Sequence, residues 1–418
     1  MSGAAEADGP RLLVLSSLFP SAAQPGAGLF IRERMFRVGK HLPIVVVAPQ
    51  PWFPLQELIR RVRPHFRPMA VRFEMMEGVE VHRPRFFCIP GVLKWTDGTF
   101  MALSIYFTVR RLVRRHRINV LDAHFGYPDG VAGTMLGRWL SLPVVLTLRG
   151  KEERQARTDV GRALRRAVCR ADRIVTVSDA LRDVAIKFGA DPARITVIGN
   201  GIDLSKFRRL PRQEARAALG LPDDARVLVT VGTLVERKGI HRVVDCLPDL
   251  LKVYPSLRYL VVGGAGPEGD ISARLRAQAA ALGVADRVHF LGPYPPERLS
   301  IPLSAADVFV LATSYEGWAN VFLEAMACGL PVVSTQVGGN AQVVCSPALG
   351  TLVPFGDAKA LTAALDDALR RAWDRDAIVA YAQSNAWETR IPPLLTLFDA
   401  VRFATAASAQ TAVEVGRG

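Results

Sequence analysis

The sequence has few cysteines and no long apolar run, and both shortages narrow the classes of protein that it can encode. Its five cysteines are odd in number and widely scattered among 418 residues, without the spacing of a zinc site or a redox pair. Such a pattern predicts reduced thiols in a cytoplasmic protein. The longest apolar candidate, Val92–Val109, is interrupted by Lys94 and Asp97 and falls short of a membrane span. Met1–Pro10 lacks the basic start and the apolar run of a signal peptide.

The net charge of +14 is unevenly distributed along the chain. Residues 1–209 hold 34 Lys and Arg against 18 Asp and Glu, a net of +16, whereas the remaining residues hold 19 against 21. This asymmetry indicates an anionic partner, which is a nucleic acid, a phospholipid or a phosphorylated substrate. The alternative is a general preference for arginine that serves solubility, but it does not explain the nearly neutral second half.

Short apolar runs alternate with helical patterns, which is typical of a parallel α/β architecture. Several runs are almost continuous Val, Leu and Ile, as expected for strands covered on both faces. The alternation stops in the segment Leu204–Asp224, interpreted as a linker, and then starts again. We therefore expect two facing Rossmann-like, doubly wound domains with a ligand cleft between them. The predicted domains are residues 1–209 and 210–386, followed at 387–418 by a C-terminal helix and tail that either cross back to the first domain or cap the second.

The most specific motif runs from Glu316 to Glu324. A buried strand, Val308–Leu311, leads into a polar loop with Glu316 and Gly317, and a helix that begins near Asn320 carries Glu324. Free amides and the positive dipole end at such a helix start suit phosphate or sugar hydroxyls. A carboxylate about one turn further can hold the two hydroxyls of a ribose. The alternative is that both are ordinary acids at a helix start.

Two glycine-containing turns precede this motif in the same half of the chain. The first follows the strand Val227–Val231 and places Arg237 and Lys238 at a helix start, which suits a diphosphate. The second contains Gly264 and Gly266 between a strand and a helix. Glycine-rich turns of this kind also occur in dinucleotide enzymes, so the second turn alone is a weak indication.

In this order the motifs resemble those of retaining glycosyltransferases of family 4, which have the GT-B fold. The resemblance implies that Glu324 holds the nucleotide ribose and that Glu316 lies beside the donor sugar. Lys238 matches the family's diphosphate lysine, whereas Thr233 stands where the family carries an arginine. Either Arg237 supplies the missing charge or the donor binds with one cation fewer. The further donor contacts expected are Gly232, Thr233, Gly264, Gly266, Gly317, Asn320 and Val321.

The first half matches the family more loosely, as an acceptor domain would. Gly26 and Gly28 lie in a loop after the first strand and are expected to let the backbone approach a ligand on the acceptor side. His124 follows a strand at the position where family members carry a histidine that touches the donor sugar. Arg149 lies in the segment Leu-Thr-Leu-Arg-Gly-Lys-Glu and is a candidate contact for a phosphate or the acceptor, with Glu152 where Asp is usual.

The resemblance implies sugar transfer with retention at the anomeric carbon. Lys238, Glu316 and His124 are the candidate catalytic residues, and the leaving phosphate itself would take the acceptor proton. No Asp-x-Asp pair stands in a suitable loop, so no essential metal is expected, and the nucleotide-diphosphate sugar is a co-substrate rather than a cofactor. The expected acceptor is a glycan or a polyprenyl-diphosphate-linked sugar of bacterial surface polysaccharide or glycolipid synthesis.

A run of arginines from Arg110 to Arg117 follows the apolar, aromatic stretch Phe100–Phe107 and predicts a basic amphipathic helix. Such a helix either lies on an anionic membrane, at the inner face of the cell membrane, or is simply a solvated face. Two other functions remain open at this point. One is a sugar-nucleotide epimerase of the same fold. The other is a nucleic-acid-binding protein, which rests on charge alone because no nucleic-acid-binding motif is present, so no nucleic acid is expected as partner.

Overall fold

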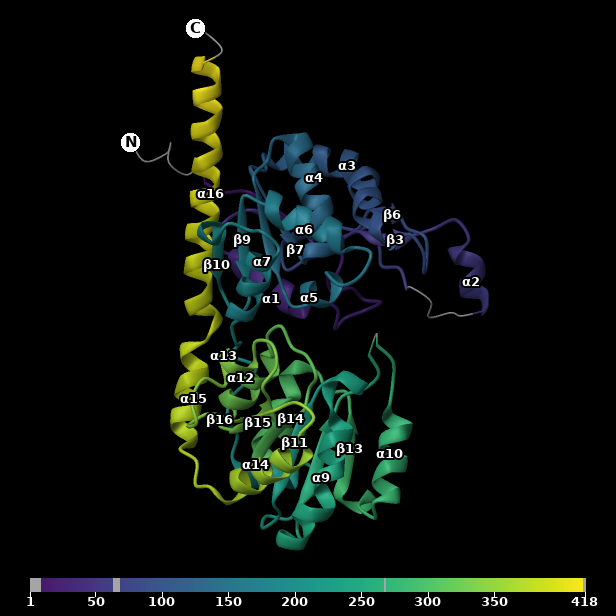
Figure 1. Cartoon of the computed structure of the whole chain (residues 1–418), viewed down its shortest axis with the longest axis vertical. Helices are drawn as coiled ribbons and strands as arrows, with labels where there is room; N and C mark the ends of the chain where they lie inside the picture. Colours follow the sequence, from purple (N-terminus) through teal and green to yellow (C-terminus); the bar gives the residue numbers. More distant parts are fainter. Residues whose placement is uncertain (1–8, 63–67, 267, 416–418) are drawn as a thin grey trace. The chain divides into compact units, whose positions relative to one another are not determined.

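The computed structural model describes residues 9–62, 68–266 and 268–415, with side chains described to residue 402, and the chain divides into two compact units. Unit 1 comprises Met1–Gly199 and Arg390–Gly418, and unit 2 comprises Asn200–Thr389. The chain thus enters unit 2 once and leaves it once (Figure 1). A single bridge pairs Ile202 with Ala386, so the entering and leaving segments lie side by side.

Unit 1 is built on an eight-stranded sheet in the order β10-β9-β8-β7-β1-β2-β5-β4. Neighbouring strands are parallel except for the antiparallel pair of β4 and β5 at one edge. A separate parallel pair joins β3 to β6. The strands are β1 (Leu12–Leu15), β2 (Ile44–Val47), β3 (Gln50–Trp52), β4 (Phe73–Met76), β5 (Val79–His82), β6 (Arg85–Phe87), β7 (Val120–His124), β8 (Val144–Leu148), β9 (Arg173–Thr176) and β10 (Ile195–Val197).

Helices surround this sheet, and its central strands β1, β7 and β8 are buried along their whole length. Burial on both faces explains why these strands read as continuous apolar runs rather than as alternating ones. The helices are α1 (Leu29–Val38), α2 (Gln56–Val62), α3 (Asp97–His116), α4 (Val131–Leu140), α5 (Glu152–Gln155), α6 (Gly161–Arg170) and α7 (Asp179–Lys187), with the C-terminal α16 (Trp387–Val415).

Unit 2 holds a fully parallel six-stranded sheet in the order β13-β12-β11-β14-β15-β16. The strands are β11 (Val227–Val231), β12 (Arg258–Val262), β13 (Val288–Gly292), β14 (Val308–Leu311), β15 (Val332–Thr335) and β16 (Gly350–Val353). The helices are α8 (Arg212–Ala217), α9 (Ile240–Val253), α10 (Ser272–Ala281), α11 (Ser300–Ala305), α12 (Asn320–Ala327), α13 (Asn340–Val343), α14 (Ala358–Arg370) and α15 (Arg375–Ser384). Val227 and Val229 of β11 pack into one apolar core, whereas Leu228 packs into another on the opposite face.

In both sheets the chain adds strands first on one side of the starting strand and then on its other side. This reversal determines where along the sheet a ligand is expected to bind. In unit 2 the chain builds outward from β11 to β13 and then returns to β14 on the other side of β11. In unit 1 the same reversal separates β1 from β7. Loops diverge at such a reversal, so ligands bind beyond the carboxyl ends of these strands. The prediction of two doubly wound, Rossmann-like domains is confirmed.

Leu204–Asp224 is not a bare linker, because it contains helix α8 and packs on unit 2. Phe207, Ala215 and Leu221 are buried in its core. The guanidinium of Arg216, fully buried, lies 3.2 Å from the carboxylate of Asp307. A buried arginine is paired with an acid far along the chain, and a local sequence pattern does not show that pairing. In the part of the chain that the structure describes, no helix combines the length and the apolar character that a membrane span requires.

Candidate active site

Four loops meet at the carboxyl edge of the unit 2 sheet, on both sides of the reversal between β11 and β14. The loop after β11 bonds to the loop after β12, since the Leu234 amide donates to the Gly264 carbonyl over 2.8 Å. The Ser314 amide, after β14, donates to the Arg237 carbonyl over 2.9 Å. The loop after β15 joins through the Gly339 amide, 3.1 Å from the Glu316 carbonyl oxygen.

Two glycines allow these loops to approach one another. Gly239 has φ +71°, and a Cβ atom placed there would lie 1.9 Å from the carbonyl oxygen of Ala312. Gly338 has φ +50°, and its Cβ atom would lie 1.8 Å from the carbonyl oxygen of Glu316. Any other residue would both strain the backbone and separate the loops. Gly239 therefore fixes the loop that carries Lys238, and Gly338 fixes the loop that carries Glu316.

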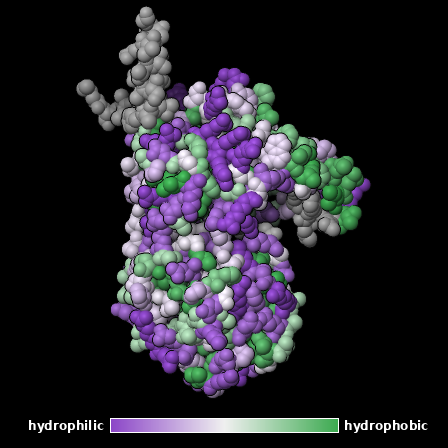
Figure 2. All heavy atoms as spheres, in the orientation of Figure 1, coloured by the Kyte–Doolittle hydropathy of each residue, from purple (hydrophilic) through white to green (hydrophobic). Residues whose placement is uncertain are grey.

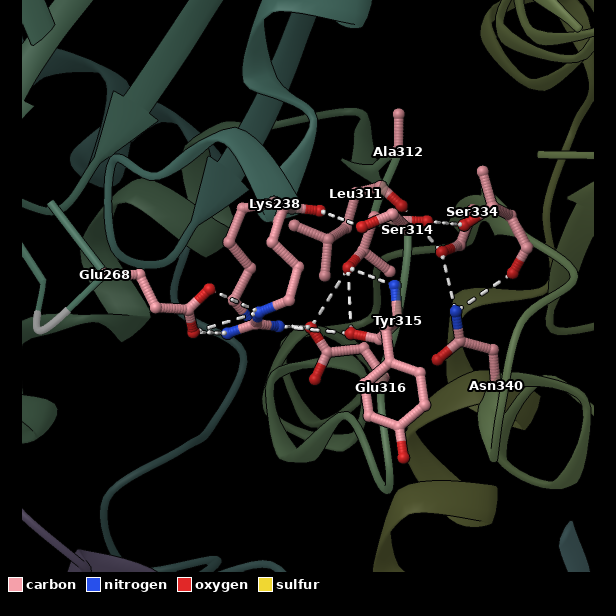
Figure 3. A network of polar contacts seen from close by, with 12 residues as sticks. Lys238, Glu268, Leu311, Ala312, Ser314, Tyr315, Glu316, Ser334 and Asn340 are labelled. Atoms are coloured by element: carbon pink, nitrogen blue, oxygen red, sulfur yellow. Dashed lines mark hydrogen bonds and ion pairs between the residues drawn. The ribbon is translucent and has the colours of Figure 1, made fainter. Parts of the chain in front are cut away.

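The centre of the site is a network of two basic and two acidic side chains (Figure 3). The Lys238 ammonium donates to Oε1 of Glu316 over 2.6 Å, and one guanidinium nitrogen of Arg237 contacts the same oxygen at 3.1 Å. The other side of the Arg237 guanidinium bonds to the Glu268 carboxylate at 3.1 Å. Two cations thus face two carboxylates, and the four formal charges of the group cancel.

Glu324 lies about one turn into α12 and is partly exposed. Burial in the surrounding protein raises the pKa of its carboxyl to about 7, while the fields of Lys238 and Lys206 lower it. The structure therefore brings Lys238 and Glu316 into direct contact, and the helix that follows the Glu316 loop carries Glu324.

The remaining donor-side candidates lie in the same loops or in the first turn of α12. Asn320 is the first residue of α12 rather than its N-cap, and its side-chain oxygen accepts from Asn200 over 2.9 Å. A Cβ atom at Gly232 would lie 3.7 Å from the Lys238 side chain. Thr233 packs on Gly266, where an added Cβ atom would meet the Thr233 Cβ at 2.9 Å. Gly264, Gly317 and Val321 are partly exposed.

In unit 1, His124 ends β7 and is fully buried between two charged side chains. Arg149 reaches the Nδ1 atom of His124 from two guanidinium nitrogens, at 3.2 and 2.9 Å. Because arginine only donates, Nδ1 accepts, and the ring proton lies on Nε2, which is 3.1 Å from the Asp122 carboxylate. Burial lowers the pKa of His124 to about 4, although Asp122 raises it. Nδ1 is occupied by Arg149, whereas Nε2 makes no hydrogen bond within the described residues, and the contact with the sugar stays a prediction.

Two acidic residues at the same edge were not among the sequence candidates for the site. Asp129 accepts from the Ser17 amide at 2.6 Å and from the Ser17 hydroxyl at 2.8 Å, and burial raises the pKa of Asp129 to about 7. This contact ties the loop after β1 to the segment after β7. Glu152 accepts from the backbone amides of Gly126, Arg149 and Gly150. Asp129 stands in a Tyr-Pro-Asp-Gly stretch typical of a turn, which gave no sign of a buried acid.

The two acceptor-side glycines, Gly26 and Gly28, differ in how closely the rest of the chain approaches them. Gly28 has φ +67°, and a Cβ atom there would lie 2.2 Å from the Leu18 carbonyl oxygen. Its conformation is therefore needed for packing against the chain's own backbone, and its approach to a ligand stays a prediction. A Cβ atom at Gly26 would meet nothing within 4 Å.

Comparison with known proteins places the chain in a family. The model of the family described as Glycosyltransferase Family 4 matches residues 41–206, and that of Glycosyl transferases group 1 matches residues 211–385. A protein of Bacillus subtilis, named as the teichuronic acid biosynthesis glycosyltransferase TuaC, is 31% identical over 79% of this chain and 82% of its own length. The chain is a family 4 glycosyltransferase. It is accordingly a transferase enzyme with the GT-B fold.

Other relatives and solved structures agree with this assignment. The D-inositol 3-phosphate glycosyltransferase of Acidothermus cellulolyticus is 35% identical over 71% of each chain. The sucrose-phosphate synthase of Thermosynechococcus elongatus is similar with a TM-score of 0.77, at 22% identity over 95% of this chain and all of that one. Anabaena HepE, solved with UDP, gives a TM-score of 0.69 at 20% identity over 93% of this chain and all of that one. Likeness at such low identity shows the fold.

The raised pKa of Glu324 predicts a pH-dependent stability. Its folded-state pKa of about 7 lies above the ordinary 4.5, so the folded chain binds more protons in that window and its free energy of unfolding falls as the pH rises through it. Glu324→Gln removes this dependence. Between about pH 5 and about pH 8, the free energy of unfolding of the unmodified chain should fall by about 2 kcal/mol relative to that of the variant. Over the same range, the melting temperature of the variant should therefore rise by roughly 4 °C relative to that of the unmodified chain.

Differential scanning calorimetry at a series of pH values measures this difference. Glu297→Gln, at an exposed position of the same unit, is the matched control and should follow the unmodified chain at every pH. A difference between Glu324→Gln and the unmodified chain that stays constant across the series would show that the carboxyl does not titrate in this range.

Proposed function

We propose that this glycosyltransferase transfers a sugar from a nucleotide-diphosphate sugar, with retention at the anomeric carbon, to a glycan or a polyprenyl-diphosphate-linked acceptor of bacterial surface polysaccharide or glycolipid synthesis. The observation that carries the proposal is the contact of Lys238 with Glu316 at the carboxyl edge of the unit 2 sheet, with Glu324 on the helix that follows the Glu316 loop. These are the residues that match the family's donor motif. Anabaena HepE, of the same fold, has been solved with UDP and with UDP-glucose, which supports a nucleotide-sugar donor.

In this proposal the donor diphosphate replaces the carboxylates that pair with Lys238 and Arg237 in the free enzyme. Lys238 and Arg237 already lie side by side on Glu316. A diphosphate that binds here receives a preformed pair of cations, and Lys238 stabilises the charge that develops on the leaving phosphate. Glu324 accepts hydrogen bonds from the ribose hydroxyls, and Glu316 lies beside the sugar. Arg237 takes the role of the arginine that the family carries at the position of Thr233.

The acceptor class rests on the relatives. One relative is named for teichuronic acid biosynthesis and another for glycosyl transfer to D-inositol 3-phosphate. Both names contain an anionic compound, an acid in one and a phosphate in the other. The basic excess of residues 1–209 suits an acceptor that carries a phosphate or diphosphate.

A ligand screen followed by product analysis tests the proposed function. Thermal-shift measurements with UDP-, GDP- and ADP-sugars should identify one nucleotide that raises the melting temperature. Incubation of that donor with polyprenyl-diphosphate-linked acceptors should then give a glycoside whose anomeric configuration by NMR equals that of the donor. An inverted product would contradict the retention, and no stabilisation by any nucleotide sugar would contradict the donor class.

Lys238→Ala is expected to lower kcat by about 100-fold or more, with a smaller effect on the KM for the donor, because the charge acts mainly on the leaving phosphate. Steady-state kinetics with the identified donor measures both parameters. Lys252→Ala removes an exposed lysine from the same unit and should leave both unchanged. A kcat for Lys238→Ala within a factor of three of the unmodified enzyme would remove the lysine from the chemical step.

Arg237→Gln and Glu268→Gln should change donor affinity in opposite directions. Loss of the Arg237 guanidinium removes a cation from the diphosphate and should weaken binding by about tenfold, from roughly 1.5 kcal/mol for a hydrogen bond to a charged group. Loss of the Glu268 carboxylate frees Arg237 from its counter-ion and should strengthen binding. Isothermal titration of the nucleotide sugar into each variant measures the two effects. Equal affinities in all three proteins would mean that the donor binds with one cation fewer.

A further inference from the structure

Helix α2 of unit 1 exposes its apolar side chains and buries a polar one. Leu55, which precedes the helix, is 61% exposed, Leu58 is 55% exposed and Val62 is 83% exposed. Gln56, by contrast, is fully buried. The three apolar residues follow a helical spacing of three and four, so they share one face. Figure 2 shows hydrophobic residues gathered over this part of the molecule, where α2 stands out beyond β3 in Figure 1.

The outer face of α3 has the same character over its first half. Leu103 is 55% exposed and Phe107, one turn further, is 75% exposed. The Phe107 ring packs edge-on against Tyr106, which packs in turn against Trp139 of α4, itself 41% exposed. The apolar surface is thus an ordered aromatic cluster that reaches solvent.

Arginines continue the same face of α3 toward its C-terminus. Arg110 and Arg114 follow Leu103 and Phe107 at helical spacing, and Arg111 lies beside them. Within the described residues no carboxylate pairs with any of these three arginines, whereas the neighbouring Arg115 contacts Glu80. The face therefore carries three positive charges without a partner next to exposed aromatic rings.

These features concentrate in one part of the chain. Among the described residues, twelve of the sixteen exposed large apolar side chains lie between Leu55 and Trp139, and only three belong to unit 2. The loop before α3 contributes Val92, Leu93 and Trp95 to this set. An exposed apolar surface of this extent marks an interaction site rather than ordinary surface variation.

We propose that α2, the loop Val92–Trp95 and the outer face of α3 form a docking surface for an anionic lipid bilayer. The apolar side chains enter the interfacial layer, tryptophan lies at headgroup level, and Arg110, Arg111 and Arg114 contact the lipid phosphates. A bilayer supplies both the apolar layer and the negative charge that this surface matches. The inference goes beyond the proposed reaction and does not depend on the identity of the donor.

Charge complementarity favours a bilayer over a second copy of the chain. In a twofold dimer through this surface, the same patch would face itself, and the three arginines of one copy would approach those of the other. Among the described residues of the surface, the one exposed acid is Glu57, which already pairs with Arg60. Like charges opposed in this way disfavour association.

Vesicle flotation of the full chain without donor tests the proposal. The protein should float with phosphatidylcholine vesicles that contain about one third phosphatidylglycerol, and stay at the bottom of the gradient with phosphatidylcholine alone. Arg110→Gln, Arg111→Gln and Arg114→Gln combined should lower the partition coefficient by on the order of a hundredfold, at about fivefold for each charge near the surface. Leu55→Ser, Leu58→Ser and Val62→Ser combined should lower it by about tenfold or more.

Val253→Ser is the matched control, because it removes an equally exposed apolar side chain, 59% exposed, from unit 2. It should float as the unmodified chain does, and circular dichroism should show that all variants keep the fold. Failure of the unmodified chain to float with anionic vesicles would overturn the proposal, as would unchanged flotation of both surface variants. A concentration-dependent dimer that Leu55→Ser, Leu58→Ser and Val62→Ser abolish would assign the surface to a second copy instead. None of these results depends on nucleotide binding, so the proposed function stands or falls separately.

Discussion

One carboxylate oxygen, Oε1 of Glu316, organises the candidate donor site. Both Lys238 and Arg237 contact it, and they reach it only because the loops after β11 and β14 meet backbone to backbone at Gly239. Glu316 is held from its other side by Gly338. Without this carboxylate, two cations would lie side by side in a partly buried place, and Glu268, which contacts Arg237, would offset only part of their repulsion. Lys238 and Arg237 are thus held in position by a counter-ion, which an anionic ligand replaces in the proposed function.

Unit 1 uses the opposite arrangement at its own binding edge. There the charged groups are buried and lie against one another or against the backbone: His124 lies between Asp122 and Arg149, and Glu152 accepts from three backbone amides. Burial holds His124 neutral with a pKa of about 4. Such a network fixes the shape of an edge rather than supplying mobile charge. Unit 2 thus holds its two cations on partly exposed carboxylates, whereas unit 1 buries its charged groups.

Much of the fold follows from the sequence because parallel strands covered on both faces read as continuous apolar runs. Strands β11 and β14 have the bounds expected. Strands β3, β4 and β6 were missed because they are short, carry polar residues or proline, and are half exposed. In the site, the roles of Lys238 and Glu316 came from the family resemblance. Glu268 and Asp129 stayed hidden because their partners lie far away in the chain and only folding brings them close.

The position of Arg390–Gly418 in unit 1 has a consequence for synthesis in the cell. Unit 2 is one uninterrupted stretch, Asn200–Thr389, set inside a unit whose first and last segments flank it. During translation the inserted unit leaves the ribosome complete, while the surrounding unit still waits for its closing helix. Unit 1, whose synthesis begins first, is therefore completed after unit 2. A truncation before Arg390 would leave the donor-side unit whole and would deprive the other of its final element.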